Sequence, residues 1–204
     1  MVILWDIVTD AKTNLIEHEF DIVCVKFSSD GKYLFTVDGG LTPSLSLWLL
    51  SGPSLIQHVY LPQKTRKRPV KNCLVEDSRS TKLLLVLENE SEGYRISCWD
   101  FSKNNLNFMF VTELDSEACC NSLYFSKTVE GGFHTSEGSI IKMWKIADMG
   151  VKQQQRIHIP QQIIESGICA LSGAFVALTF LGHAILLSNE VFIVTNLRVN
   201  ILVY

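Results

Sequence analysis

The chain has 204 residues, of which 47% are hydrophobic and only 19% are charged, so it can bury a core and is not a disordered tail. Its net charge of −3 excludes an overall positive field, and we therefore expect neither nucleic acid nor a membrane as a partner.

The first part of the chain contains short runs rich in β-branched and aromatic residues, separated by turn signals. After a first run at 2–7, strands are predicted at 21–27, 32–37, 44–50 and 55–61. The stretch from Ser28 to Gly31 predicts a turn, because Asp30 can bond its own backbone and glycine accepts a positive φ. Helical spacing of apolar residues is missing, so the pattern predicts an all-β fold.

Strands of the same kind are predicted along the rest of the chain. In chain order they cover 73–75, 82–87, 95–99, 108–112, 118–125, 132–135, 139–145, 163–171, 175–180, 184–187 and 191–194. Short strands at regular spacing are typical of a sandwich, a barrel or a propeller.

The four tryptophans mark an internal repeat that separates these folds. Trp5, Trp48, Trp99 and Trp144 each lie in a strand-like run, and they are 43, 51 and 45 residues apart. A further step of 44 residues reaches Ser188, near the end of the similar run AILLSN. Periods of about 40–45 residues are those of a four-stranded propeller blade, so the repeat favours a propeller.

The stretch HEFDIVCVKFSSDGKYLFTVDGG, followed by LSLWLL, resembles a repeat of the WD-repeat family. The matching positions are the opening histidine, the FS-x-DG-K turn and the closing tryptophan, at His18, Asp21, Phe27, Ser28, Asp30, Gly31 and Trp48. The glycine that usually precedes the histidine is replaced by Glu17. The long loops and divergent repeats are similar to those of large cytoskeletal and ciliary members of the family.

This resemblance implies WD-repeat type β-propeller blades, about four of them, in an incomplete ring. The expected units are the end of a partial blade at 1–16, a blade at 17–61, a blade with a basic insertion at 62–112, a blade at 113–158, and a degenerate blade with a tail at 159–204. An incomplete ring leaves a strand edge open at each end, so we expect a fragment or short form of a larger protein.

The resemblance also implies a structural cluster in which His18, Thr36, Asp38 and Trp48 are joined by hydrogen bonds. The alternative for the same region is a catalytic triad of His18, Ser28 and Asp38. We favour the structural interpretation, because buried polar groups satisfy one another and the sequence lacks a nucleophile elbow, a zinc-binding helix motif and a phosphate-binding loop.

Two loops are candidate sites of contact with another protein. The first holds Glu19 and Phe20, whose ring would anchor a partner if it were exposed. The second is the basic run 64–71, with Arg66, Lys67 and Arg68, which is most simply a solvated insertion but could be an import signal or a nucleic-acid contact. The acidic segment 88–92 is interpreted as an exposed loop.

The cysteines and the chain's first residues bear on the compartment. The six cysteines form no C-x-x-C pair and no cluster with metal-ligand spacing, so no metal or other cofactor is expected. With no secretory pattern at the start, we predict reduced, buried thiols and an intracellular protein, cytoplasmic or cytoskeletal and ciliary. The uncharged stretch 166–189 is long enough for a membrane span, but its polar residues favour strands around a turn.

Together these patterns predict a scaffold that holds other proteins in an intracellular assembly and is not an enzyme. Two alternatives stay open. One is a membrane-associated protein held by 166–189, and the other is a fragment of a propeller-domain enzyme, which would need a convergent set of carboxylates or histidines.

Overall fold

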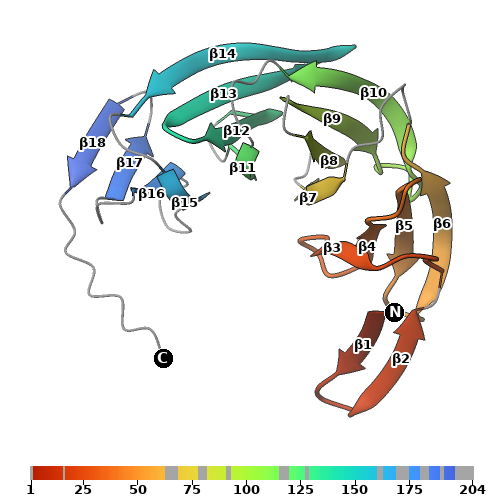
Figure 1. The fold of residues 1–204 in the computed structure, drawn as a ribbon. Helices are drawn as coiled ribbons and strands as arrows, with labels where there is room; N and C mark the ends of the chain where they lie inside the picture. The colour runs from red at the N-terminus through yellow and green to blue at the C-terminus, as the bar shows by residue number, and fades with distance from the viewer. Residues whose placement is uncertain are drawn as a thin grey trace. The chain divides into compact units, whose positions relative to one another are not determined.

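The computed structural model describes residues 2–15, 17–62, 69–77, 82–90, 93–114, 120–126, 129–159, 163–168, 175–179, 184–188 and 191–195. Every regular secondary-structure element in these residues is a β-strand, so the prediction of an all-β fold is confirmed (Figure 1). Over the same residues, no helix is long and apolar enough to span a bilayer. The described part of 166–189 lies in three strands instead.

The strands form one two-stranded and four four-stranded sheets, all antiparallel. The short sheet pairs β1 (Val2–Asp6) with β2 (Ala11–Leu15). The second sheet contains β3 (Ile22–Phe27), β4 (Tyr33–Asp38), β5 (Ser44–Leu49) and β6 (Ser54–Tyr60), and the third contains β7 (Val70–Asp77), β8 (Lys82–Glu90), β9 (Gly93–Asp100) and β10 (Asn107–Leu114). The fourth contains β11 (Cys120–Phe125), β12 (Gly132–Glu137), β13 (Ile140–Ala147) and β14 (Gly150–His158), and the fifth contains β15 (Ile163–Ile168), β16 (Phe175–Thr179), β17 (Ala184–Ser188) and β18 (Val191–Thr195).

Two strands, β2 and β14, were not predicted. Their sequences, AKTNL and GVKQQQRIH, are mostly polar, and most of their residues are exposed or half-buried. Each is an outer strand that pairs with one neighbour in its sheet, so it has little apolar surface to cover. Prediction from hydrophobic patterning therefore misses such strands.

The chain divides into two compact units, one formed by 1–90 and 94–114 and the other by 91–93 and 115–204. In the first unit, a core lies between the β3–β6 and β7–β10 sheets. Alternate residues of β4 enter this core, at Tyr33, Phe35 and Val37, where they meet residues such as Trp99 and Phe101. Leu34 points to the opposite face and packs with Trp48 against the β1–β2 hairpin. The alternation of β4 thus joins three sheets into one unit.

In the second unit, the core lies between the β11–β14 and β15–β18 sheets. Ile141 and Ile157 from the first of these sheets pack with Ile163 and Ala177 from the second. The backbone N–H of Ile163 also donates to the carbonyl oxygen of Gly138, at 2.8 Å. This bond fixes the first residue of β15 to the turn between β12 and β13.

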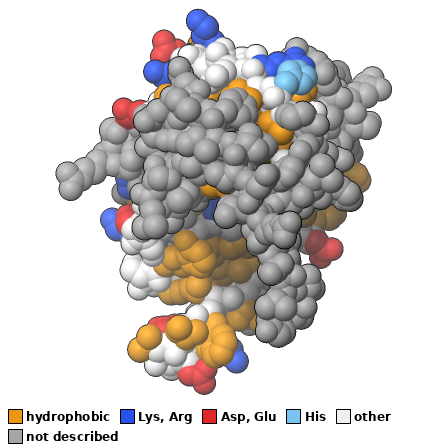
Figure 2. Space-filling view, turned by 90° about the vertical axis from the view of Figure 1, so that its left-hand side faces the viewer, with side chains coloured by type: hydrophobic (Ala, Val, Ile, Leu, Met, Phe, Trp, Pro, Cys, Tyr) orange, Lys and Arg blue, Asp and Glu red, His pale blue; other side chains and the backbone are white. Residues whose placement is uncertain are grey.

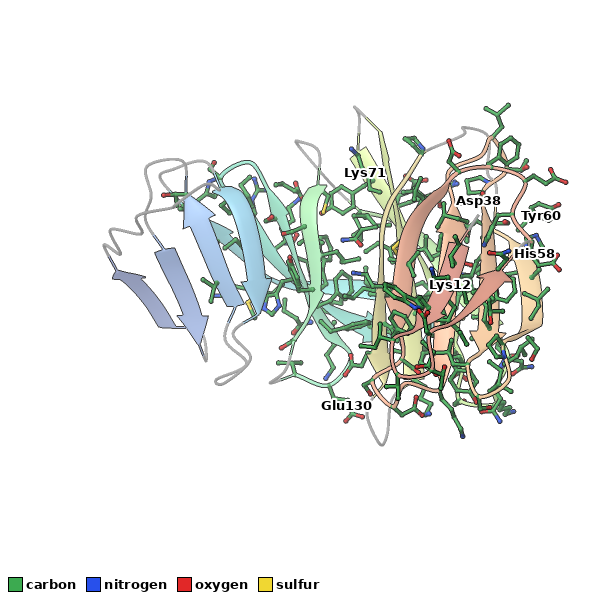
Figure 3. The ribbon with its side chains drawn as sticks, turned by 90° about the horizontal axis from the view of Figure 1, so that it is seen from below. Lys12, Asp38, His58, Tyr60, Lys71 and Glu130 are labelled. Atoms are coloured by element: carbon green, nitrogen blue, oxygen red, sulfur yellow. A yellow bond between two sulfur atoms is a disulfide. The ribbon has the colours of Figure 1, made fainter. Side chains whose placement is uncertain are left out.

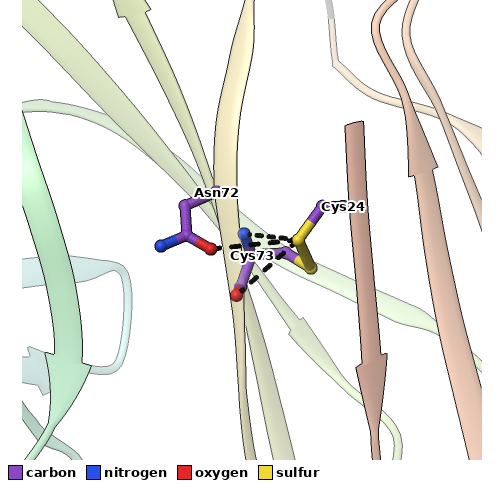
Figure 4. Close-up of a disulfide and its surroundings, with 3 residues drawn as sticks. All are labelled: Cys24, Asn72 and Cys73. Atoms are coloured by element: carbon purple, nitrogen blue, oxygen red, sulfur yellow. Dashed lines mark hydrogen bonds between the residues drawn. A yellow bond between two sulfur atoms is a disulfide. The ribbon is translucent and has the colours of Figure 1, made fainter. Parts of the chain in front are cut away.

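The prediction that all six cysteines are reduced is wrong, because Cys24 and Cys73 form a disulfide (Figure 4). Cys24 lies on β3 and Cys73 on β7, which are neighbouring strands of two packed sheets within the first unit. The two residues are 49 positions apart, so no local cysteine motif could reveal the pair. Cys98 and Cys120 are buried and lie outside this disulfide. The prediction of a reducing compartment therefore loses one of its premises.

Candidate functional site

The structure brings His18, Thr36, Asp38 and Trp48 together in one hydrogen-bonded cluster at the end of the β3–β6 sheet. The Nδ1 atom of His18 lies 3.0 Å from the Asp38 carboxylate, and its Nε2 atom lies 2.6 Å from the Thr36 hydroxyl. The indole N–H of Trp48 donates to the same hydroxyl at 2.9 Å. These contacts are satisfied if Nδ1–H of His18 donates to Asp38 and Nε2 accepts from Thr36.

Asp38 also organises the loop that follows it. Its carboxylate accepts hydrogen bonds from the backbone N–H groups of Gly40 and Ser44 and from the Ser44 hydroxyl, at 3.3, 2.9 and 2.5 Å. Burial acts to raise the pKa of Asp38, but these bonds and the one from His18 outweigh it, and the pKa is lowered. Burial lowers the pKa of His18. The cluster therefore holds an ionised carboxylate beside a neutral imidazole.

This cluster does not form the alternative triad. Ser28 lies in the turn between β3 and β4, where its hydroxyl donates to Asp30 at 2.6 Å and accepts from the backbone N–H of Tyr33 at 2.9 Å. Ile22 pairs with Asp38 and Phe27 with Leu34, which places Ser28 at the other end of β3 from the cluster. Thr36, the hydroxyl that does contact His18, is 0% exposed and cannot meet a substrate.

A second histidine adjoins the cluster on its outer side. His58, on β6, places its ring edge against that of His18, with centroids 5.8 Å apart, and its Nδ1 lies 2.9 Å from the Ser46 hydroxyl. Tyr60 packs on His58 and is 60% exposed. Figure 3 shows Asp38, His58 and Tyr60 near one another at one end of this sheet. The aromatic rings of His58 and Tyr60 thus form the side of the cluster nearest to solvent, and His58 is half-buried.

The candidate contact residues fall partly outside the described part of the chain. Glu19 is exposed, and Phe20 is 42% exposed, with its ring lying over Gly40 so closely that a Cβ at Gly40 would clash with it. Arg66, Lys67 and Arg68 lie outside the described residues. The interpretation of 88–92 as an exposed loop is wrong at its start, because β8 continues to Glu90 and Glu88 is 0% exposed.

A buried polar residue occupies one register position in all four four-stranded sheets. In each sheet this residue lies on the second strand and pairs with the residue of the first strand that directly precedes a β-bulge. The pairs are Ile22 with Asp38, Val70 with Glu88, Cys120 with Glu137 and Ile163 with Thr179. The partners differ between sheets. Asp38 uses His18 and Ser44, Glu88 forms two 2.7 Å bonds with Arg95, and Glu137 bonds Lys142 at 3.1 Å. The position is therefore a repeated structural element, at which the three acidic residues bond a partner in their own sheet or in the segment leading into it and the fourth residue is the uncharged Thr179.

A cavity of about 330 Å³ lies within the second unit, beside the β11–β14 sheet. Its lining includes Ser126 and Val129 from the turn before β12, and Phe133, His134, Met143, Trp144, Gln154 and Gln155 from the strands. A volume of this size is at the lower end of small-molecule sites. Sequence reasoning missed it, because His134 stands in no motif and becomes part of a cavity only through the pairing of β12, β13 and β14.

The imidazole of His134 is the titratable group of this cavity. The residue is 6% exposed, and burial lowers the pKa of His134 to about 4. The ring is therefore neutral at physiological pH and can donate at one nitrogen and accept at the other. Gln154 is exposed and Gln155 half-buried, so two amides stand nearer to solvent than the histidine. The cavity can hold an uncharged molecule that makes hydrogen bonds.

No group of three or more histidine, cysteine, aspartate and glutamate residues within the described ranges could hold a metal ion. No family model matches the sequence, and no curated protein matches it. Solved structures do match the fold. One is a putative 6-phosphogluconolactonase from Bacteroides uniformis, which is 13% identical, with a TM-score of 0.64 over 85% of this chain. The match covers 53% of that protein, so the chain spans about half its length.

This likeness corrects the functional prediction. The expectation of a non-catalytic scaffold rested on the WD-repeat resemblance and on the lack of catalytic motifs in the sequence, whereas the fold is similar to that of a protein described as a lactonase. The alternative of a propeller-domain enzyme fragment fits this finding better. The separate expectation that the chain has no catalytic activity of its own stays a prediction, as do its WD-repeat membership and its protein partners.

Proposed function

We propose that this chain is a set of WD-type β-propeller blades from an enzyme-type domain, and that the cavity beside His134 binds its small-molecule ligand. The observation that carries the proposal is the fold likeness to the lactonase-type protein over 85% of the chain. Four consecutive four-stranded antiparallel sheets with a tryptophan in the third strand of three of them support the blade assignment.

The proposed ligand is a small uncharged ring compound with hydroxyl groups and a carbonyl, such as a sugar lactone. The name of the solved neighbour refers to a phosphorylated sugar lactone and suggests the lactone ring, whereas the choice of an uncharged compound rests on the cavity lining, which suits it for two reasons. Phe133, Met143 and Trp144 make part of the cavity lining apolar, which suits the apolar face of a sugar ring. His134 and Gln155 offer donors and acceptors without a charge, which suits hydroxyl and carbonyl groups.

In such a site, His134 orients the ligand through hydrogen bonds and contributes less by abstracting a proton. A pKa of about 4 keeps the ring unprotonated at neutral pH, so it is always able to accept a proton. The same low pKa makes the ring a weak base, and general-base catalysis is most effective when the pKa lies near the working pH. We therefore expect ligand binding to depend on His134 more strongly than turnover does.

Titration calorimetry with the lactam analogue of glucono-δ-lactone tests binding, and a pH-indicator assay with the lactone and its 6-phosphate tests turnover. We expect binding by the chain and at least a tenfold loss in His134→Gln and in the cavity-filling variant Met143→Phe. The matched control is His58→Gln, which changes a histidine outside the cavity. Absence of both binding and turnover at millimolar ligand would refute the enzyme-type assignment. Binding that survives both cavity variants would place the site elsewhere.

A further inference from the structure

The outer strand β14 contains a β-bulge at the point where it lines the cavity of the second unit. Met143 pairs with Gln155, and Trp144, the next residue of β13, pairs with Gln153. Gln154 is therefore the extra residue of the bulge, and a bulge sets two residues of one strand against one residue of the next. Gln154 and Gln155 both line the cavity, whereas Gln153 lies outside the lining. The bulge thus brings two consecutive glutamines to one cavity, which the alternating faces of a regular strand would separate.

The register places these glutamines on the same side of the sheet as the histidine of the cavity. His134 pairs with Met143, and Met143 pairs with Gln155, so the three side chains share one face of the β11–β14 sheet. Strand β12 lies inside β13 and β14 lies outside it. His134 is buried, Gln155 is half-buried and Gln154 is exposed. The imidazole therefore stands at the inner end of the cavity and the two amides at its outer end.

The same bulge occurs on the outer strands of two other sheets, where it carries different residues. In each case it adjoins the residue opposite the tryptophan of the third strand, and the extra residue is Ile56 on β6 and Met109 on β10. The residue that follows is Gln57 on β6 and Phe110 on β10. Of these three bulges, that of β14 is the one with glutamine at both positions. The backbone geometry therefore does not require the amides.

Gln57 shows how an amide at the second position of this bulge binds. Its side-chain oxygen accepts from the backbone N–H of Leu106 at 2.7 Å, and its side-chain nitrogen donates to the carbonyl oxygen of Leu106 at 3.2 Å. The amide thus uses its acceptor and its donor at once, on a group that lies outside its own sheet. Gln155 occupies the same register position, beside the cavity.

Polar residues on an outer strand do not by themselves indicate a ligand. Strand β14 lies at the upper end of Figure 1, and at the same height the face seen in Figure 2 carries Lys, Arg and His side chains, as a solvated strand does. Gln154 and Gln155 differ from such residues because they line a cavity of about 330 Å³ that a buried histidine also lines. Among the described residues, the lining includes no carboxylate, lysine or arginine, so uncharged hydrogen bonds select the ligand.

We propose that Gln154 and Gln155 determine the specificity of the cavity by binding two neighbouring hydroxyl groups of the ligand. This inference rests on the proposed function, because it concerns the same cavity and the same class of ligand. A hydroxyl group is both a donor and an acceptor, and each amide offers N–H donors and a carbonyl acceptor, so two adjacent amides match a vicinal diol. An anionic group is matched less well, because the described lining supplies no counter-charge.

The test compares two cyclic lactams in ligand-observed NMR titrations of the full chain. One is the lactam analogue of glucono-δ-lactone, and the other is δ-valerolactam, which has the same ring and carbonyl but no hydroxyl group. We expect the wild-type chain to bind the hydroxylated lactam at least tenfold more tightly. The double variant Gln154→Leu with Gln155→Leu should lose this preference, because only the hydroxylated lactam binds more weakly. Gln153→Leu, on the same strand but outside the lining, is the matched control and should stay within twofold.

The possible failures of this test point to different errors. Equal binding of the two lactams by the wild-type chain, or a preference that survives in the double variant, would refute the role of the two amides without affecting the proposed function. Equal weakening of both lactams would assign the glutamines a structural role like that of Gln57. Failure of both lactams to bind the wild-type chain would refute the proposed function and this inference with it.

A second variant keeps the test valid if the double variant does not fold, which circular dichroism shows. Gln154→Leu changes only the exposed residue of the bulge, so the strand keeps its half-buried amide. We expect it to reduce the preference for the hydroxylated lactam at least threefold. An unchanged preference in this variant would exclude Gln154 from the proposed pair.

Discussion

Neutralising Glu88 should destabilise the chain far more than neutralising an exposed carboxylate. Glu88 and Arg95 are 0% and 1% exposed, and two hydrogen bonds of 2.7 Å join the carboxylate to the guanidinium. The hydrogen bonds with Glu88 are the largest cause that raises the pKa of Arg95, and they outweigh burial. Glu88→Gln keeps the shape of the side chain but leaves the guanidinium charge buried and unpaired.

Removing one partner of a buried ion pair costs about 3–5 kcal/mol of unfolding free energy. With a urea m-value of about 2 kcal/mol/M, this cost lowers the midpoint of urea unfolding by about 2 M. Tryptophan fluorescence follows the transition, because Trp99 is buried and lies on β9, the strand that carries Arg95. The double variant Glu88→Met with Arg95→Met removes both charges and should lose much less, since apolar side chains of similar length fill the space without a buried charge.

Glu19→Gln is the matched control, because Glu19 is exposed and its loss should change the midpoint little. If Glu88→Gln shifts the midpoint no more than Glu19→Gln does, the pair is not buried as described. If the double variant is as unstable as Glu88→Gln, the cost arises from lost packing and not from an unpaired charge.

Three further predictions concern titration and sulfur chemistry. Burial lowers the pKa of His134 from 6.5 to about 4, so as pH falls the imidazole is protonated in the unfolded chain before it is protonated in the folded chain. The free energy of unfolding should therefore fall by about 3 kcal/mol between pH 6.5 and pH 4. Urea unfolding at several pH values should show this slope, and His134→Gln should flatten it; an unchanged slope would mean that the histidine is solvated. Reduction of the Cys24–Cys73 disulfide, which closes a loop of 49 residues, should cost about 4 kcal/mol, measured by unfolding with and without dithiothreitol; equal midpoints would contradict the bond. Burial raises the pKa of Cys98 and Cys120 to about 12, so neither thiol should react with Ellman's reagent at pH 8 in the folded chain, and prompt labelling of either would show that it is accessible.

The all-β fold and the order of most strands could be predicted because apolar and β-branched residues gather in the inner three strands of each sheet. Strand β4 is the clearest case, since all six of its residues are buried. The polar outer strands β2 and β14 could not be predicted, because pairing with a single neighbour needs no hydrophobic pattern. Strands that are buried on both faces can thus be predicted from the sequence, whereas exposed strands at the sheet edges cannot.

The residues of the candidate functional sites could be predicted from the sequence only in part. Residues that resemble a known repeat, such as His18 and Asp38, could be expected to meet, and the structure places them 3.0 Å apart. The ion pairs of Arg95 and Lys142, the disulfide and the His134 cavity could not be predicted, because each joins residues whose types match no motif. These features depend on which strands become neighbours, and that information is spread over the whole sheet.

The register position shared by Asp38, Glu88, Glu137 and Thr179 has a consequence for how such a chain can diversify. Each acidic residue finds a bonded partner within its own sheet or in the segment that leads into it. A duplication, deletion or exchange of one sheet together with that segment would carry each acidic residue along with its bonded partner. A substitution at one acidic position can therefore be matched by a substitution of its bonded partner in the same sheet or in the segment that leads into it.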